Sequence, residues 1–133
     1  MKKIKLGYVP TRRSIFSAPD AIKYRGLTAD RLTELGIDFV DIPDINAAAL
    51  LYDDRAVEQL AETFELVRVD GLMLAHCYFG TAYVCARLAT RLGLPVLLWG
   101  PLVERPEPTG ARLRDTPCGL FSTGQVLSRF RVP

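Results

Sequence analysis

The clearest indication of the fold class is the stretch VDGLMLAHCYFGT, residues 69–81. Residues 71–75 form a short, almost uniformly apolar run with no alternation of apolar and polar positions. Such a run predicts a strand that is buried on both faces, because a strand with one solvent-exposed face would alternate apolar and polar residues. A helix is predicted from about Thr81, since apolar residues recur behind it at helical spacing: Val84, Cys85, Leu88, Ala89 and Leu92. The stretch is therefore typical of one strand–helix unit of a parallel sheet.

The same alternation of strand and helix extends in both directions along the chain. Further strands are predicted at 4–9, 38–42 and 96–98, and further helices at about 17–36, from Asp54 onward and at 123–130. Ser17 and Asp20 resemble a capping box at the start of the first of these helices. Apolar strands separated by helices predict an α/β domain with a doubly wound, mostly parallel sheet, flavodoxin-like or Rossmann-like.

Composition narrows the class of protein. The 133 residues suit a single domain, and 17 basic against 15 acidic residues, without a basic block, argue against nucleic-acid binding. No apolar run approaches the length of a membrane span. Three cysteines without a C-x-x-C pair predict reduced thiols and a cytoplasmic location. Because the chain stops at Pro133, where a fifth strand is expected, we expect residues 1–133 to be an amino-terminal fragment of a longer protein.

Polar and aromatic side chains follow the predicted strands. In an open parallel sheet, ligands bind at the carboxyl ends of the strands. The sequence places five candidate substrate-binding residues there, suited to the hydroxyls and C–H faces of a neutral or phosphorylated polyol: Arg12, Arg13, His76, Tyr78 and Trp99. Each also has a structural interpretation, since the arginines can be solvated or paired, the histidine packed or capping, and the tryptophan part of the core or its rim.

Other chemistries lack their motifs. No G-x-G-x-x-G follows the first strand and no P-loop motif is present, which excludes these nucleotide sites. One histidine and scattered aspartates do not provide the spacing of a metal site, so we assign no metal ligand and no catalytic residue. Cys77 as a nucleophile beside His76 is disfavoured, because adjacent strand residues point to opposite faces.

A long segment rich in proline and arginine follows Trp99. Structureless loops of this length are uncommon unless they are functional, so we expect residues 102–116 to be poorly ordered when the chain is alone. Residues 118–121 are apolar again, and we expect them to pack on the core of the domain.

Four motifs together resemble a known family. LGYVPTRRSIFS (6–17), VDGLMLAHCYFGT (69–81), PVLLWGP (95–101) and GARLRDTPCGLFSTGQVLSRFRVP (110–133) resemble, in this order, the amino-terminal region of L-fucose isomerase-like proteins, a family grouped with L-fucose and L-arabinose isomerases. The tryptophan-glycine-proline block and the block around Cys118 are the most specific. The resemblance covers almost the whole chain.

The resemblance implies the amino-terminal domain of a metal-dependent aldose–ketose isomerase. Such enzymes are large cytoplasmic homo-oligomers in which later domains hold a divalent cation, usually Mn2+, as a Lewis acid. This domain would help to form the sugar pocket of a neighbouring subunit, with the Arg12–Arg13 loop and residues 76–79 touching the sugar. The loop after Trp99 would pack against other domains and subunits, where its arginines, Arg105, Arg112 and Arg114, would meet carboxylates. The chain alone would be inactive, without a cofactor of its own, and its partners would be a sugar, its later domains and neighbouring subunits. The alternatives are a non-catalytic sugar- or sugar-phosphate-binding domain on the same scaffold, and an interaction module whose exposed loop serves only oligomerisation.

Overall fold

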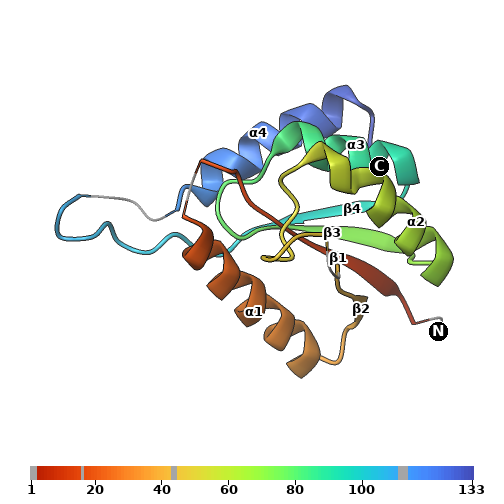
Figure 1. Ribbon diagram of the computed structural model, residues 1–133, viewed down its shortest axis with the longest axis horizontal. Helices are drawn as coiled ribbons and strands as arrows, with labels where there is room; N and C mark the ends of the chain where they lie inside the picture. Colours follow the sequence, from red (N-terminus) through yellow and green to blue (C-terminus); the bar gives the residue numbers. More distant parts are fainter. Residues whose placement is uncertain (1–2, 16, 43–44, 111–113) are drawn as a thin grey trace.

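A computed structural model describes residues 3–15, 17–42, 45–110 and 114–133. Strands and helices alternate along these residues (Figure 1): β1 (Lys5–Thr11), α1 (Ala18–Glu34), β2 (Asp38–Val40), a 3-10 turn (Asp54–Ala56) leading into α2 (Val57–Val67), β3 (Gly71–His76), α3 (Ala82–Leu92), β4 (Val96–Trp99) and α4 (Thr116–Arg129). The predicted order of strand and helix is confirmed.

The strands form one parallel sheet in the order β2-β1-β3-β4. The central pair has the longest register, from Leu6 opposite Gly71 to Thr11 opposite His76. Helix α1 covers one face of the sheet, while α2, α3 and α4 cover the other (Figure 1). This is the doubly wound arrangement that the sequence predicts.

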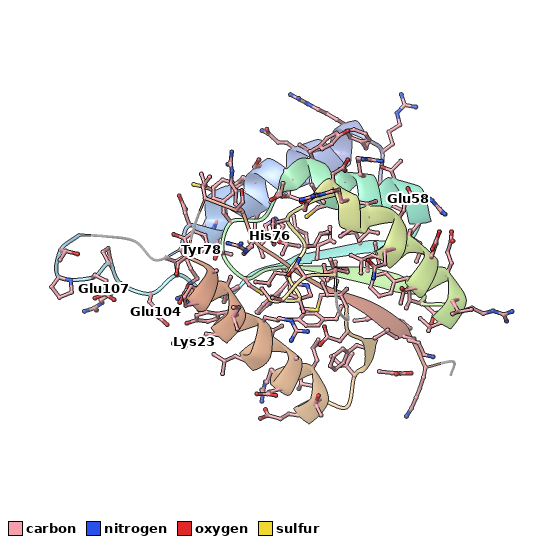
Figure 2. All side chains as sticks on the ribbon, viewed as in Figure 1. Lys23, Glu58, His76, Tyr78, Glu104 and Glu107 are labelled. Atoms are coloured by element: carbon pink, nitrogen blue, oxygen red, sulfur yellow. The ribbon has the colours of Figure 1, made fainter. Side chains whose placement is uncertain are left out.

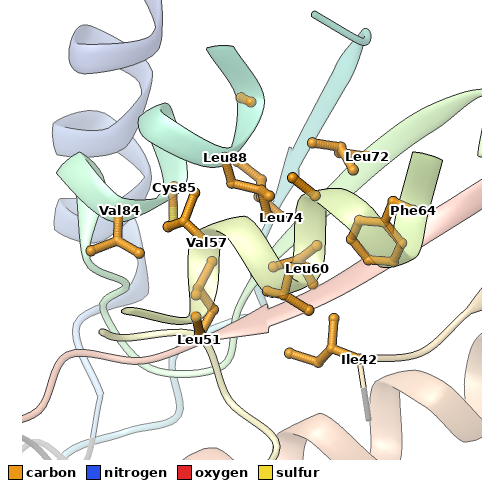
Figure 3. Close-up of a cluster of buried hydrophobic side chains, with 14 of the residues drawn as sticks. Ile42, Leu51, Val57, Leu60, Phe64, Leu72, Leu74, Val84, Cys85 and Leu88 are labelled. Atoms are coloured by element: carbon orange, nitrogen blue, oxygen red, sulfur yellow. The ribbon is translucent and has the colours of Figure 1, made fainter. Parts of the chain in front are cut away.

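Strand residues alternate between two hydrophobic clusters because successive side chains point to opposite faces. Val9, Leu72 and Leu74 face α2 and α3, where Phe64 and Leu88 meet them (Figure 3). On the opposite face, a second cluster joins α1 to the sheet through Tyr8, Ala21, Leu32, Met73 and Ala75. All six residues of β3 are buried, which confirms a strand covered on both faces.

Strand β1 continues through Pro10 to Thr11, two residues beyond the predicted end. Pro10 has no N–H to donate, which normally restricts proline to strand edges. Here β2 pairs only with residues 5–7 of β1, so the ladder on that side has already ended at Pro10. The Pro10 carbonyl instead accepts a hydrogen bond from Leu51 N at 2.8 Å.

Two expectations about helix starts are wrong in detail. Ser17 occupies the N-cap of α1 but makes no side-chain capping bond, and the Asp20 carboxylate, expected in the capping box, is paired with Arg114 from a distant segment. Helix α4 begins at Thr116 instead of 123. As a result Cys118 and Phe121 lie on the helix surface, the latter 77% exposed, and do not pack inward as expected, whereas Gly119 is buried and Leu120 is half-buried.

Candidate functional site at the carboxyl edge of the sheet

Three strands end together at one edge of the sheet. Thr11 is opposite His76 at the ends of β1 and β3, and Ala75 is opposite Trp99 at the end of β4. Arg12 and Arg13 follow β1 directly, so four of the five predicted site residues lie at or just beyond this carboxyl edge, and Tyr78 follows two residues after His76. The predicted placement of Arg12, Arg13, His76 and Trp99 at a common edge is confirmed.

His76 is completely buried at this edge, where it joins several elements (Figure 2). Its Nδ1 lies 3.0 Å from Thr11 Oγ1, and its Nε2 lies 2.7 Å from Thr123 Oγ1 of α4. Both ring nitrogens therefore have protein partners. In this arrangement the ring connects β1, β3 and α4, and it presents no surface to a ligand in solution.

The imidazole of His76 is held neutral. Burial lowers its pKa from 6.5 to about 4, and a hydrogen bond with the backbone of Gly119 opposes part of the shift. Gly80 follows in the left-handed region with φ of 81°, and a Cβ there would lie 2.4 Å from His76 Nε2. Glycine at position 80 thus permits both the turn and the contact with the ring.

The two arginines lie over aromatic rings. The guanidinium carbon of Arg12 is 4.4 Å from the centroid of the Tyr52 ring, and that of Arg13 is 5.2 Å from the centroid of Phe79. Arg12 is half-buried and Arg13 is exposed. Cation–π contacts of this kind hold each positive charge near a ring face, so the edge combines positive charge with aromatic surface.

The backbone beneath Arg12 is fixed from both sides. Arg12 N donates to Leu51 O at 3.1 Å, and Thr81 Oγ1 donates to Arg12 O at 2.8 Å. Thr81 is the N-cap of α3, yet its hydroxyl bonds Arg12 and not its own helix. Since α3 and the 45–52 loop both anchor this residue, the geometry of the arginine loop depends on two neighbouring elements.

Tyr78 and Trp99 lie more within the protein than on its surface. Tyr78 is 4% exposed and packs on the cluster beneath α1, where burial raises its pKa. Trp99 is half-buried and contacts the same cluster. The structure therefore brings Arg12 and Arg13 to the surface of the edge, with Tyr78 and Trp99 beneath or beside it.

Arg114 makes the most extensive ionic contacts at this end of the domain. It is 2% exposed, its Nη1 lies 3.3 Å from Asp20 Oδ2 and its Nη2 lies 3.3 Å from Glu104 Oε1. Its guanidinium carbon is 3.7 Å from the centroid of Tyr24, whose hydroxyl donates to Glu104. The expectation that Arg114 meets carboxylates of another domain is wrong, because it is paired within its own chain.

This Arg114 cluster anchors the segment between β4 and α4, which extends away from the body of the domain (Figure 1). Thr116 is buried as well and donates to Tyr78 O at 3.1 Å. The end of the 102–116 segment is thus attached to α1 and to the loop after β3, so the expectation of poor order is wrong for Arg114 and Thr116. Arg105 is exposed, and Arg112 lies outside the described residues.

Cys77 is not available as a nucleophile. It is buried in the cluster beneath α1, on the opposite side of the strand from His76, and burial raises the pKa of its thiol to about 12. A thiol protonated at neutral pH is a poor nucleophile. The sequence argument against this reaction is confirmed.

Sequence reasoning missed Tyr52, Tyr24 and Glu104. Tyr52 and Glu104 come from stretches without helical or strand periodicity, and Tyr24 lies at a half-buried position of α1. Each acquires its role from a partner far away in sequence. Tyr52 reaches the site because Leu51 forms an isolated parallel bridge with Thr11. The sequence signal for Tyr52 is weak: an aromatic residue that follows a loop whose backbone is hydrogen-bonded to the Asn46 side chain.

The described residues contain no group of three or more histidine, cysteine, aspartate or glutamate side chains that could hold a metal ion. They therefore do not fit a resident divalent cation, and no catalytic step through one is derived for them. In the part of the chain that the structure describes, no helix has the length and apolar character needed to cross a bilayer.

Comparison with known proteins gives one match. The family described as "Fucose/sulfoquinovose isomerase, N-terminal domain" matches residues 7–133, nearly the whole chain. No curated protein and no solved structure matched. The match spans the parallel sheet, the arginine loop, His76 and all of α4, which are the elements that build the carboxyl edge. The chain therefore belongs to the fucose/sulfoquinovose isomerase N-terminal domain family.

Proposed function

We propose that this chain is the domain of a metal-dependent aldose–ketose isomerase that supplies one wall of a sugar pocket, completed by other domains and by a neighbouring subunit. The observation that carries the proposal is the pair of arginines over Tyr52 and Phe79 at the carboxyl edge. Guanidinium N–H groups donate to sugar oxygens, and ring faces pack against sugar C–H groups.

The remaining parts of the reaction belong outside these residues. A cation would polarise the carbonyl and hydroxyl of the open-chain sugar when bound, and the residues that the structure describes offer no ligand set for it. The role of this domain is therefore to bind and orient the sugar and to exclude water. His76 acts in this proposal as a positioning residue, because its ring holds β1 and α4 together beneath the arginine loop.

The family name includes two sugars of different charge. Fucose is neutral, whereas sulfoquinovose carries a sulfonate, which is a permanent anion at neutral pH. Arg12 and Arg13 would donate hydrogen bonds to either sugar but would attract only the sulfonate through charge. Comparison of the two sugars on the same protein therefore separates hydroxyl recognition from anion recognition.

Binding is tested by NMR titration of the labelled chain with each sugar. We expect dissociation constants on the order of millimolar, since only one wall is present, and amide shifts confined to residues 12–13 and 79. Arg13→Gln should weaken binding severalfold, while Arg68→Gln, at an exposed arginine after α2, should leave it unchanged. No shift at this edge at saturating sugar would overturn the proposal, whereas micromolar binding would favour the alternative, a self-contained, non-catalytic sugar-binding domain.

The isomerase assignment is tested by assay and calorimetry with Mn2+. We expect this chain alone to show no aldose–ketose interconversion and no stoichiometric micromolar Mn2+ binding, because its described residues offer no ligand set. Tight Mn2+ binding by the 133-residue chain would overturn the assignment of the metal to other domains.

A further inference from the structure

Helix α4 exposes a surface that is unusual for a helix facing solvent. From Thr116 to Ser128 it contains no charged residue, whereas the exposed side of α2 carries three glutamates within 11 residues: Glu58, Glu62 and Glu65. Phe121 on this surface is 77% exposed. Depletion of charge together with an exposed aromatic residue is the composition of the centre of a protein interface.

An apolar groove runs beside this surface. It has a volume of about 830 Å³ and lies between the outer side of α4 and residues 100–103, which follow β4. Leu102, 93% exposed, stands at one side, and Pro117, Leu120 and Phe121 form much of the other. Gly124 also lines the groove and adds no side chain to it. Apolar projections and an apolar hollow thus lie next to each other.

Charge is arranged with opposite signs at the two ends of α4. Asp115 is the N-cap, Arg129 lies in the last turn and lines the groove, and Arg131 follows. Two copies of this helix placed antiparallel would bring the basic end of each next to the acidic end of the other. The dipoles of the two helices would oppose as well, which is favourable. Two parallel helices would instead bring like charges together.

We propose that this α4 face, defined as the exposed side of α4 with residues 100–103, binds a second copy of the same chain. The two α4 helices pack antiparallel about a two-fold axis, which makes the interface self-complementary. With Arg129 opposite Asp115 of the second copy, Phe121 lies next to Gly124 of the second copy. The aromatic ring of each chain then fills space that the glycine of the other leaves open. The proposal is independent of the sugar-binding proposal.

The test is sedimentation equilibrium of the chain between about 1 µM and 1 mM. We expect a reversible monomer–dimer equilibrium that Phe121→Glu weakens at least thirtyfold, as expected for a central aromatic anchor. Leu66→Glu is the matched control, since Leu66 is an apolar residue on α2, 84% exposed and away from the α4 face. Because Phe121 and Leu66 are both exposed, both variants should retain the wild-type circular dichroism, and Leu102→Glu provides a second probe of the groove.

The antiparallel orientation has its own test. Arg129→Asp should weaken association about fivefold, and adding Asp115→Arg on the same chain should restore it. Failure of the double variant to restore association would overturn the orientation. A wild-type chain that stays monomeric to about 1 mM, or a dimer that tolerates both Phe121→Glu and Leu102→Glu, would overturn the proposal and leave the groove to a different segment or partner.

Discussion

The imidazole of His76 links Thr11 on β1 to Thr123 on α4, with ring nitrogens 3.0 Å and 2.7 Å from the two hydroxyl oxygens. All three residues are buried. Because a hydrogen bond lost in the protein interior is costly, both the ring and the two hydroxyls are stabilised by these contacts. This linkage fastens the last helix to the centre of the sheet.

Replacement of His76 by alanine should therefore destabilise the fold strongly. We expect His76→Ala to lower the free energy of unfolding by about 3 kcal/mol or more, because it leaves a cavity and removes a hydrogen-bond partner from each of two buried hydroxyls. Urea denaturation at pH 7 measures the change. Thr90→Ala, at an exposed position of α3, is the control and should change stability by less than about 0.5 kcal/mol. Equal effects of the two substitutions would contradict the linking role of His76.

The stability of the protein should depend on pH through the same residue. Below pH 6.5 the unfolded chain protonates its histidine, whereas the folded chain does so only near a pKa of about 4. The unfolded state thus binds more protons between these values, and stability falls as pH falls through this window. We expect a loss of about 2 kcal/mol between pH 7 and pH 5.

The sequence provides the control for this pH dependence. His76 is the only histidine in the chain, so His76→Gln should abolish most of the slope between pH 7 and pH 5. Urea denaturation at the two pH values gives the slope, and NMR titration of the ring gives the pKa directly. A measured pKa near 6.5 in the folded protein would rule out the proposed dependence.

Gly119 should tolerate no side chain. A Cβ at this position would lie 1.8 Å from the carbonyl oxygen of Phe79, a backbone atom that cannot move aside cheaply. We expect Gly119→Ala to destabilise the protein by several kcal/mol, on the order of 2–4, by pushing α4 off the end of β3. Gly26→Ala in α1 is the matched control, because nothing lies within 4 Å of its Cβ position and alanine favours the helix by about 1 kcal/mol. Thermal unfolding that shows the same sign for both variants would contradict this account.

Arg114 should control access to the segment between β4 and α4. Arg114→Met removes the ion pairs to Asp20 and Glu104, so we expect cleavage after Glu104 by a glutamate-specific protease to accelerate about tenfold. Arg105→Met, at an exposed neighbour, should have a much smaller effect. Unchanged cleavage in Arg114→Met would show that the segment is held by other contacts.

The periodicity of apolar residues predicted the strands and helices whose buried faces depend only on the local sequence. Leu72 and Leu74 alternate with Met73 and Ala75 between two clusters, and a uniformly apolar strand could have no other environment. The helical spacing of Val84 and Leu88 likewise predicted the buried face of α3. Gly93, with φ of 62°, ends that helix in the left-handed conformation that glycine commonly adopts after the last turn.

The errors come from contacts between distant residues. The Ser17–Asp20 capping box was a sound local prediction, but Arg114 pairs with Asp20 across 94 residues of sequence. The burial of His76 depends on Gly80, Gly119 and Thr123, which no spacing rule connects with a strand end. The early start of α4 was missed because Pro117 and Gly119 are poor helix formers in the middle of a helix, although proline is favourable in the first turn.

The order of strands has a consequence for the kinetics of folding. The central pair joins β1 to β3, and its first rungs connect Leu6 with Gly71 across 65 residues. Closure of so large a loop is entropically costly, and proteins dominated by such distant contacts fold slowly. During synthesis, residues 5–11 can begin to pair with β2, but they lack their main partner until residue 76 has left the ribosome. Until then the nascent chain exposes Tyr8 and Val9, both fully buried in the folded domain, so this interval is when a chaperone would bind it most readily.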